Sequence, residues 1–130
     1  MIVLDASVLI GHFEPADLHH ARATALLTAH LADSFAASVV TLAEVYVGAS
    51  RAGQADRLDR LLAQLAIESL ELPGDAAHRL GELRAATGLK MPHCCVLYTA
   101  ERHNAAIATF DDALADRATN IGLAVACAPG

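Results

Sequence analysis

Short apolar segments alternate along this chain with stretches of helical character. The first, Ile2 to Leu4, ends at Asp5 and is typical of a strand buried on both faces of a sheet. Four more segments predict strands, at 35–40, 67–72, 105–109 and 121–127. Apolar spacing and helix boundary residues predict helices at 17–32, 41–52, 54–66, 75–87, 92–104 and 111–117, with a short helix that Ser7 would cap.

This alternation of strands and helices predicts the fold class. Strands joined through helices pair in parallel, and the helices cover both faces of the sheet. We therefore expect an α/β protein of three layers, with a mostly parallel central sheet between two layers of helices. At 130 residues, with no internal repeat or linker, the chain is expected to form one domain over residues 1–130.

Composition narrows the class of protein without indicating a function. Hydrophobic residues make up 55% of the chain and charged residues 18%, which excludes a disordered protein. The longest stretch without an acid, lysine or arginine is 118–130, which is shorter than the about 20 residues that cross a membrane. Three cysteines make no disulfide framework, and no basic leader precedes the first strand, so we expect a reduced, cytoplasmic protein.

The charge balance is acidic, with a formal net charge of −6 at pH 7. A protein that coats nucleic acid through phosphate contacts is normally basic, so the charge argues against this class. A nuclease remains compatible with an acidic chain, because bound divalent cations reverse the local field of its carboxylates.

Three acids and a histidine are expected to meet at one edge of the sheet. In open parallel sheets, ligands bind outside the carboxyl ends of the strands. Asp5, Glu44 and Asp111 each follow a predicted strand, and His93 begins the helix after Pro92. Carboxylates gathered in this way repel one another unless a cation binds, and oxygen ligands suit Mg²⁺ or Mn²⁺. The sequence therefore predicts a divalent metal site at these four residues.

Each of these residues also has a structural interpretation. Thr41 and Glu44 have the spacing of a helix capping box, and Asp111 is a good N-cap for the helix that follows it. His93 taken alone fits a partly exposed side chain near a helix start. Asp5 is the hardest to explain in this way, because an acid directly after a buried strand must be paired, capping or liganded.

Four segments in register resemble the motifs of one known family. They are Met1–Ser7, Thr41–Ala49, Leu89–Leu97 and Ala108–Leu114, and together they look like PIN-domain ribonucleases, particularly the VapC-like toxins of prokaryotic toxin–antitoxin pairs. The resemblance covers essentially the whole chain. No single motif is very specific, but the four occur in the family's order.

The resemblance implies a PIN-like fold and a metal-dependent endoribonuclease that hydrolyses RNA phosphodiesters with Mg²⁺ or Mn²⁺. Asp5, Glu44 and Asp111 match three of the family's four acids, which implies that they are catalytic residues and metal ligands. Ser7 and Thr109 match hydroxyl positions near the metal. The resemblance also implies a homodimer and a VapB-like antitoxin whose C-terminal segment covers the acidic site.

Position 93 departs from the family's pattern, which usually has Asp after the proline. Here the fourth metal position is His93. Because an imidazole brings a neutral nitrogen where the family has a charged oxygen, we expect weaker Mg²⁺ binding and lower activity.

Other polar residues have less specific expectations. Adjacent helix residues point about 100° apart, so the neighbouring cysteines at 94 and 95 are expected in the core rather than on one ion. The two histidines at 19 and 20 are expected to be solvated. Three arginines are expected near the entry to the site helix, where they either meet RNA phosphates or form a mixed-charge solvated face. They are Arg51, Arg57 and Arg60.

Three alternative functions stay open at this point. One is a catalytically inactive PIN module that still binds an antitoxin. Another is a receiver-like phosphoacceptor domain, which needs paired acids after the first strand and a lysine after a late strand. The single Asp5 and the single lysine, Lys90, fit that class poorly. The third is a small metal-dependent phosphatase.

Overall fold

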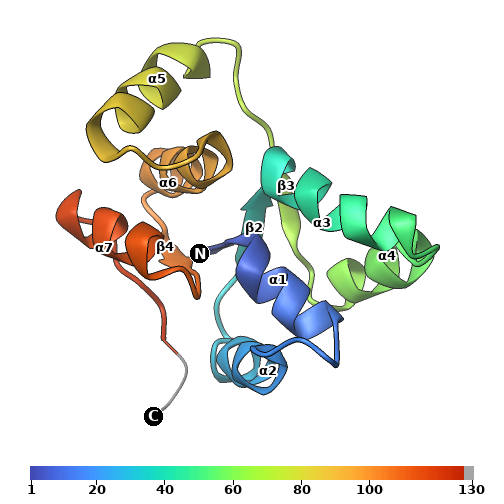
Figure 1. The fold of residues 1–130 in the computed structure, drawn as a ribbon. Helices are drawn as coiled ribbons and strands as arrows, with labels where there is room; N and C mark the ends of the chain where they lie inside the picture. The colour runs from blue at the N-terminus through green and yellow to red at the C-terminus, as the bar shows by residue number, and fades with distance from the viewer. Residues whose placement is uncertain (128–130) are drawn as a thin grey trace.

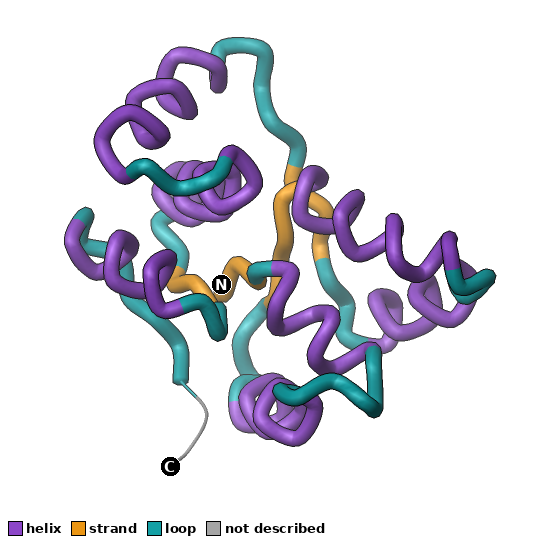
Figure 2. The backbone as a smooth tube through the Cα atoms, in the orientation of Figure 1, coloured by secondary structure: helices purple, strands orange, loops and turns teal. Residues whose placement is uncertain are grey.

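A central parallel sheet organises the protein, as a computed structural model of residues 1–127 shows (Figures 1 and 2). The last three residues of the expected domain, 128–130, lie outside the described residues. The strands lie in the order β3-β2-β1-β4, and every pair is parallel. Their bounds are β1 (Ile2–Leu4), β2 (Phe35–Ser38), β3 (Glu68–Leu70) and β4 (Ala106–Ala108).

Helices cover both faces of this sheet (Figure 1). Ile2 and Leu4 belong to a hydrophobic cluster with α1 to α4, whereas Val3 belongs to a second cluster with α5 to α7. The side chains of β1 thus alternate between two cores, which confirms the three-layer α/β class. The helices are α1 (Ala6–Phe13), α2 (His20–Ala29), α3 (Val39–Arg51), α4 (Ala55–Gln64), α5 (Ala76–Thr87), α6 (Met91–His103) and α7 (Asp112–Asn120).

The start of α3 differs from the sequence prediction. The helix begins at Val39, and the side chain of Ser38 caps it by accepting a hydrogen bond from the backbone N–H of Val40 at 3.2 Å. Thr41 is therefore inside the helix, where its hydroxyl is buried without a hydrogen-bond partner among the described residues. The predicted capping box of Thr41 and Glu44 is wrong, and Glu44 has no capping role.

Other boundaries differ as well: the helix predicted at 17–32 spans His20–Ala29, and the strands predicted at 35–40 and 67–72 are shorter. The first helix begins at Ala6, so Ser7 lies in its first turn rather than capping it. The strand predicted at 121–127 is reduced to one parallel bridge between Ile107 and Val125. Helix α7 extends to Asn120, and the chain turns at Gly122, whose φ of +86° favours glycine, so few residues remain to pair with β4.

Close packing of α1 on α2 brings the start of α2 toward the sheet edge. Gly11 is buried at this contact, where an added Cβ would lie 3.2 Å from the Cβ of Ala23. A larger residue would push the helices apart, because an interior this tightly packed has no room for another methyl group. Figure 1 shows α2 next to α1, at the lower end of the sheet.

Among residues 1–127, no helix combines the length and the apolar character that crossing a bilayer would require.

The turn after α4 leads to a stability prediction. Ala66 adopts a left-handed conformation with φ of +52°, which L-residues with a Cβ avoid. We expect Ala66→Gly to raise the free energy of unfolding by about 0.5 kcal/mol, since the relief of strain exceeds the extra entropy of glycine in the unfolded chain. The exposed helical control Ala63→Gly should lower it by about 1 kcal/mol. Urea unfolding measures both, and a loss of stability in both variants would contradict this account.

Candidate active site

The carboxylate of Asp5 is the buried centre of the site. Asp5 follows the central strand β1, and only 4% of its surface is exposed. Its Oδ2 accepts hydrogen bonds from the hydroxyls of Ser7 and Thr109, each at 2.8 Å. Its backbone N–H donates to the carbonyl of Ala108 at 2.9 Å. A carboxylate can be buried here because two donors satisfy one oxygen, and these donors come from α1 and from the segment after β4.

The same two hydroxyls organise the segment that leads to Asp111. Ser7 Oγ accepts a hydrogen bond from the backbone N–H of Phe110 at 3.0 Å, and Thr109 Oγ1 accepts one from the N–H of Asp111 at 3.0 Å. Each hydroxyl therefore donates to Asp5 and accepts from the loop, which fixes the loop relative to the buried carboxylate.

His93 lies next to Asp5. Its Nε2 is 3.8 Å from Oδ1 of Asp5, the carboxylate oxygen that the hydroxyls leave unused. Helix α6 positions His93 in its first turn. Pro92 fits there because backbone N–H groups in the first turn have no intrahelical acceptor, and proline has no N–H. The distance is longer than a hydrogen bond, so the imidazole and the carboxylate are neighbours rather than a bonded pair.

Glu44 joins the site from α3. The residue is exposed, yet partial desolvation of its carboxylate raises its pKa, and so does the negative charge of Asp5, while His93 lowers it. Two carboxylates that disfavour each other's charge are typical of a site that binds a cation or a proton. The influence of Asp5 and His93 on Glu44 brings these three predicted residues into one electrostatic group.

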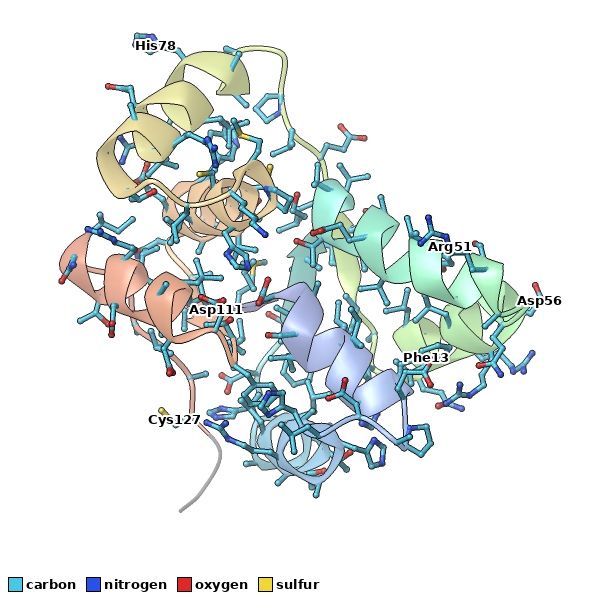
Figure 3. The ribbon with its side chains drawn as sticks, viewed as in Figure 1. Phe13, Arg51, Asp56, His78, Asp111 and Cys127 are labelled. Atoms are coloured by element: carbon cyan, nitrogen blue, oxygen red, sulfur yellow. The ribbon has the colours of Figure 1, made fainter. Side chains whose placement is uncertain are left out.

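Asp111 has a structural role in addition to its place near Asp5. Its Oδ1 accepts a hydrogen bond from the backbone N–H of Leu114 at 2.8 Å and so caps α7. The N-cap interpretation is therefore confirmed. Figure 3 shows Asp111 beside the start of α1, the helix that follows Asp5. One oxygen of Asp111 is engaged in the cap, which leaves the other available to a ligand.

The donor set fits a hydrated divalent cation better than a closed metal cage. Among residues 1–127, no three His, Cys, Asp or Glu side chains are arranged to hold an ion by themselves. Asp5 Oδ1 has no hydrogen bond within this part of the chain, and Glu44 is repelled by Asp5. Mg²⁺ commonly keeps several waters and binds one or two carboxylates, so these two residues suit such an ion.

The neighbouring cysteines are part of the core, as predicted. Cys94 and Cys95 are 0% and 2% exposed. Burial raises the pKa of both thiols, and for Cys95 the charges of Cys94 and Glu44 raise it further. A neutral, buried thiol is a poor nucleophile and a poor metal ligand.

Two of the three arginines for which an RNA contact and a solvated face were the alternatives, Arg51 and Arg57, have their places fixed by other contacts or by α3. Arg51 is seven residues beyond Glu44 on α3, about 10 Å along the helix. Figure 3 shows Arg51 on α3, well apart from Asp111. Arg57 lies over the ring of Phe13 at 4.1 Å and donates to the backbone carbonyl of Phe13, so it has a packing role.

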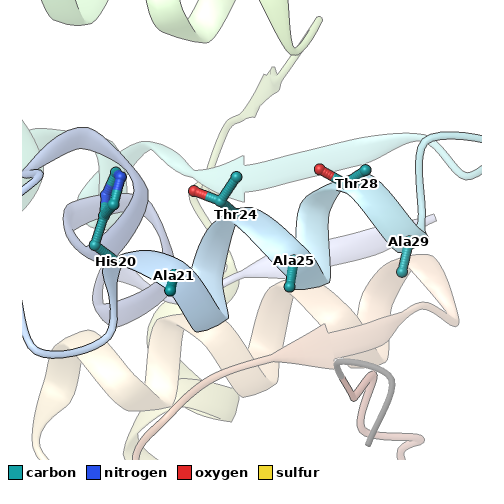
Figure 4. Close-up of a pocket in the computed structure, with 6 residues that line it drawn as sticks. All are labelled: His20, Ala21, Thr24, Ala25, Thr28 and Ala29. Atoms are coloured by element: carbon teal, nitrogen blue, oxygen red, sulfur yellow. The ribbon is translucent and has the colours of Figure 1, made fainter.

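A shallow groove follows the outer face of α2 (Figure 4). All of its lining residues are on α2, and none of them is among the residues around Asp5. Its lining residues are His20, Ala21, Thr24, Ala25, Thr28 and Ala29.

A protein-family comparison identifies the domain. The model of the PIN domain matches residues 2–120, a range that contains all four predicted site residues. The chain belongs to the PIN-domain family. The resemblance stated from four motifs is thus confirmed, and the receiver-like alternative is wrong. No curated protein matches the chain at a significant level.

Solved structures with the same fold include several toxins. A chain of a toxin–antitoxin complex from Klebsiella pneumoniae is 26% identical, with a TM-score of 0.74, and the match covers 94% of this PIN domain and 93% of that chain. VapC20 of Mycobacterium tuberculosis, a Sarcin-Ricin loop cleaving toxin, is 14% identical, with a TM-score of 0.80 and coverage of 99% and 100%. VapBC2 of Rickettsia felis, bound to a promoter DNA fragment, is 19% identical, with a TM-score of 0.72 and coverage of 96% and 97%.

Sequence reasoning missed the surroundings of Phe110. His19 and His20 were expected to be solvated, but both are half-buried: His19 stacks on Phe110, and Nδ1 of His20 lies 2.9 Å from the carbonyl of Gly11. The available signal was an aromatic residue directly before Asp111 in a chain with only 4% aromatics.

The hydrogen bonds to Asp5 lead to a prediction for the metal-free protein. Thr109→Val keeps the side-chain shape but removes one donor to a buried carboxylate, so we expect the free energy of unfolding to fall by about 1–3 kcal/mol. Thr119→Val is the matched control, since its exposed hydroxyl bonds only to Ala115 within α7, and it should change stability by less than about 0.5 kcal/mol. Urea unfolding with a chelator measures both. Equal losses would contradict a special role for Thr109.

Proposed function

We propose that this PIN domain, spanning residues 1–130, is a metal-dependent endoribonuclease and the toxin of a toxin–antitoxin pair. It would hydrolyse RNA phosphodiesters with Mg²⁺ or Mn²⁺, with Asp5, Glu44 and Asp111 as catalytic residues. The observation that carries this proposal is the buried carboxylate of Asp5, which has one oxygen bonded by two hydroxyls and the other free of hydrogen bonds within residues 1–127. Membership of the PIN family supports it.

Each residue of the site would have a different role in catalysis. Ser7 and Thr109 hold the Asp5 carboxylate in one orientation, so that its Oδ1 is directed to a ligand. Glu44, whose carboxylate is made more basic by partial desolvation and by Asp5, would bind the ion or orient the attacking water. Asp111 would contribute the oxygen that does not cap α7. A bound divalent cation lowers the pKa of water and offsets the charge that develops on the phosphate.

An antitoxin and a second copy of this chain are the partners that we propose. The Klebsiella pneumoniae chain, 26% identical over nearly its whole length, belongs to a toxin–antitoxin complex, which supports a VapB-like antitoxin for this protein. An acidic site would attract a basic residue of such a partner, most of all arginine, whose planar fork matches carboxylates. Exposed large apolar residues on α3 and α6, among them Val47 and Met91, support a homodimer.

An inactive module is the second candidate, and one observation favours it. His93, rather than an acid, is the neighbour of Asp5 Oδ1. An imidazole adds no negative charge to the site and is a poor ligand for Mg²⁺, so the ion would be held less tightly than by four acids. Such a domain would bind an antitoxin without cutting RNA.

The catalytic proposal predicts the effect of Asp5→Asn. The amide keeps the size of the side chain but removes the charge, so RNA cleavage with Mn²⁺ should fall by about a hundredfold or more. The control Asp56→Asn removes an acid at the start of α4, far from Asp111 (Figure 3), and should cut like the parent. Gel analysis of a labelled RNA measures cleavage, and circular dichroism checks the fold. Equal rates for parent and Asp5→Asn would refute the proposed site.

A nucleotide-monoester substrate tests the phosphatase alternative on the same samples. Release of phosphate from the monoester without cleavage of RNA would replace the nuclease proposal with a phosphatase.

The position of His93 beside Asp5 predicts that an acid at this position would strengthen metal binding. His93→Asp restores a charged oxygen, so we expect Mg²⁺ to bind about tenfold more tightly than in the parent and RNA cleavage with Mg²⁺ to rise. The increase of the unfolding midpoint with added Mg²⁺ measures binding without activity. His103→Asp, at the exposed end of α6, is the control. Equal Mg²⁺ affinity in parent and His93→Asp would exclude position 93 from the metal site.

A further inference from the structure

Three side chains gather at Phe110, which two hydrogen bonds connect to the buried carboxylate, and we call them the Phe110 cluster. The ring of Phe110 stacks with the imidazole of His19, with 4.8 Å between centroids and 28° between planes. The guanidinium carbon of Arg22 lies 4.7 Å from the centroid of the Phe110 ring, which is a cation–π distance. One end of α2 and the loop before α7 therefore meet at this aromatic ring.

The Phe110 cluster is tied directly to the site. The backbone N–H of Phe110 donates to Ser7 Oγ, and Ser7 in turn donates to Asp5 Oδ2. Two hydrogen bonds thus connect the cluster to the buried carboxylate. His19 is held as well, because its backbone N–H donates to Asp17 Oδ1 at 2.8 Å.

Arg22 keeps its hydrogen-bonding capacity. It is exposed, and within residues 1–127 it takes part in no ion pair and no hydrogen bond, although two acids follow Phe110 in the chain. Arg57 lies over Phe13 in a similar way, but its N–H groups are used by Gln54 and by the carbonyl of Phe13. Arg57 therefore has a packing role, whereas the N–H groups of Arg22 remain available to a ligand.

We propose that Arg22 binds a backbone phosphate of the RNA, with Phe110 and His19 holding its guanidinium beside the site. This inference rests on the proposed nuclease function and names a substrate-positioning residue for it. A guanidinium stacked on an aromatic ring keeps its N–H edge free for the bidentate phosphate contact that arginine favours. A protein with a net charge of −6 and an acidic site repels RNA, so one oriented cation near the carboxylates has a large effect on where the backbone lies.

Binding of RNA without metal tests the proposal. A short fluorescently labelled single-stranded RNA is titrated with the parent and with variants in EDTA, over a series of salt concentrations. Arg22→Gln should weaken binding about tenfold and reduce the slope of log K against log salt by about 0.7, the loss of one phosphate contact. Arg51→Gln removes the same charge at the far end of α3 and should leave both quantities close to those of the parent.

The aromatic part of the cluster has its own variant. Phe110→Leu keeps an apolar side chain but removes the ring under Arg22, so it should weaken RNA binding by about threefold while the slope stays within error of the parent's, because the charge is retained. With metal present, Arg22→Gln should raise KM for RNA and leave kcat within about twofold, as expected for a group that binds substrate and transition state alike.

The outcomes separate this inference from the proposed function. If Arg22→Gln and Arg51→Gln bind RNA equally, or if the parent does not bind RNA at low salt, the role of Arg22 is refuted, whatever the cleavage assay gives. If Asp5→Asn abolishes cleavage at the same time, the nuclease proposal stands without Arg22. If Asp5→Asn cuts like the parent, the nuclease proposal fails by its own test, and with it the inference.

Discussion

The carboxylate of Asp5 is buried at the end of the central strand, where a negative charge is tolerated only with hydrogen bonds or a cation around it. One oxygen is satisfied by Ser7 and Thr109, and these two hydroxyls also bind the backbone of the loop that carries Phe110 and Asp111. The positions of α1, of this loop and of the start of α7 are therefore set by one charged group. The second oxygen is where a ligand can act.

Electrostatics divides the site into two parts. On one side, partial desolvation and the negative charge of Asp5 raise the pKa of Glu44, and the repulsion between the two carboxylates suits a cation. On the other side, Arg22 lies over Phe110 without a carboxylate partner among the described residues. If the proposed function holds, an anionic chain that binds an anionic polymer would need both features: a bound cation would attract the phosphate to be cut, and the arginine would attract a neighbouring phosphate.

The small side chains of the strands allow the helices to approach the sheet closely. β4 has the sequence Ala-Ile-Ala and β2 has Phe-Ala-Ala-Ser, and these strands are buried apart from the partly exposed Ala106. The two hydrophobic clusters supply most of the apolar burial, on opposite faces of β1. Each strand has only three or four residues, and the buried Asp5 follows β1 directly, so the site adjoins the core. Rigid packing close to the site is what positions a catalytic group accurately.

The sequence by itself determined the alternation of strands and helices and the parallel sheet. It also determined that Asp5, Glu44 and Asp111 each come after a different strand of that sheet. These features depend on local periodicity and chain order, which the sequence contains directly. The tertiary structure alone decided that Ser38 rather than Thr41 caps α3, and that 121–127 forms a single bridge. It also decided that Arg22 and His19 meet Phe110, residues about ninety positions apart in the chain. Contacts of this kind depend on how closely α1 packs on α2 at Gly11. No local sequence pattern encodes the separation of these two helices.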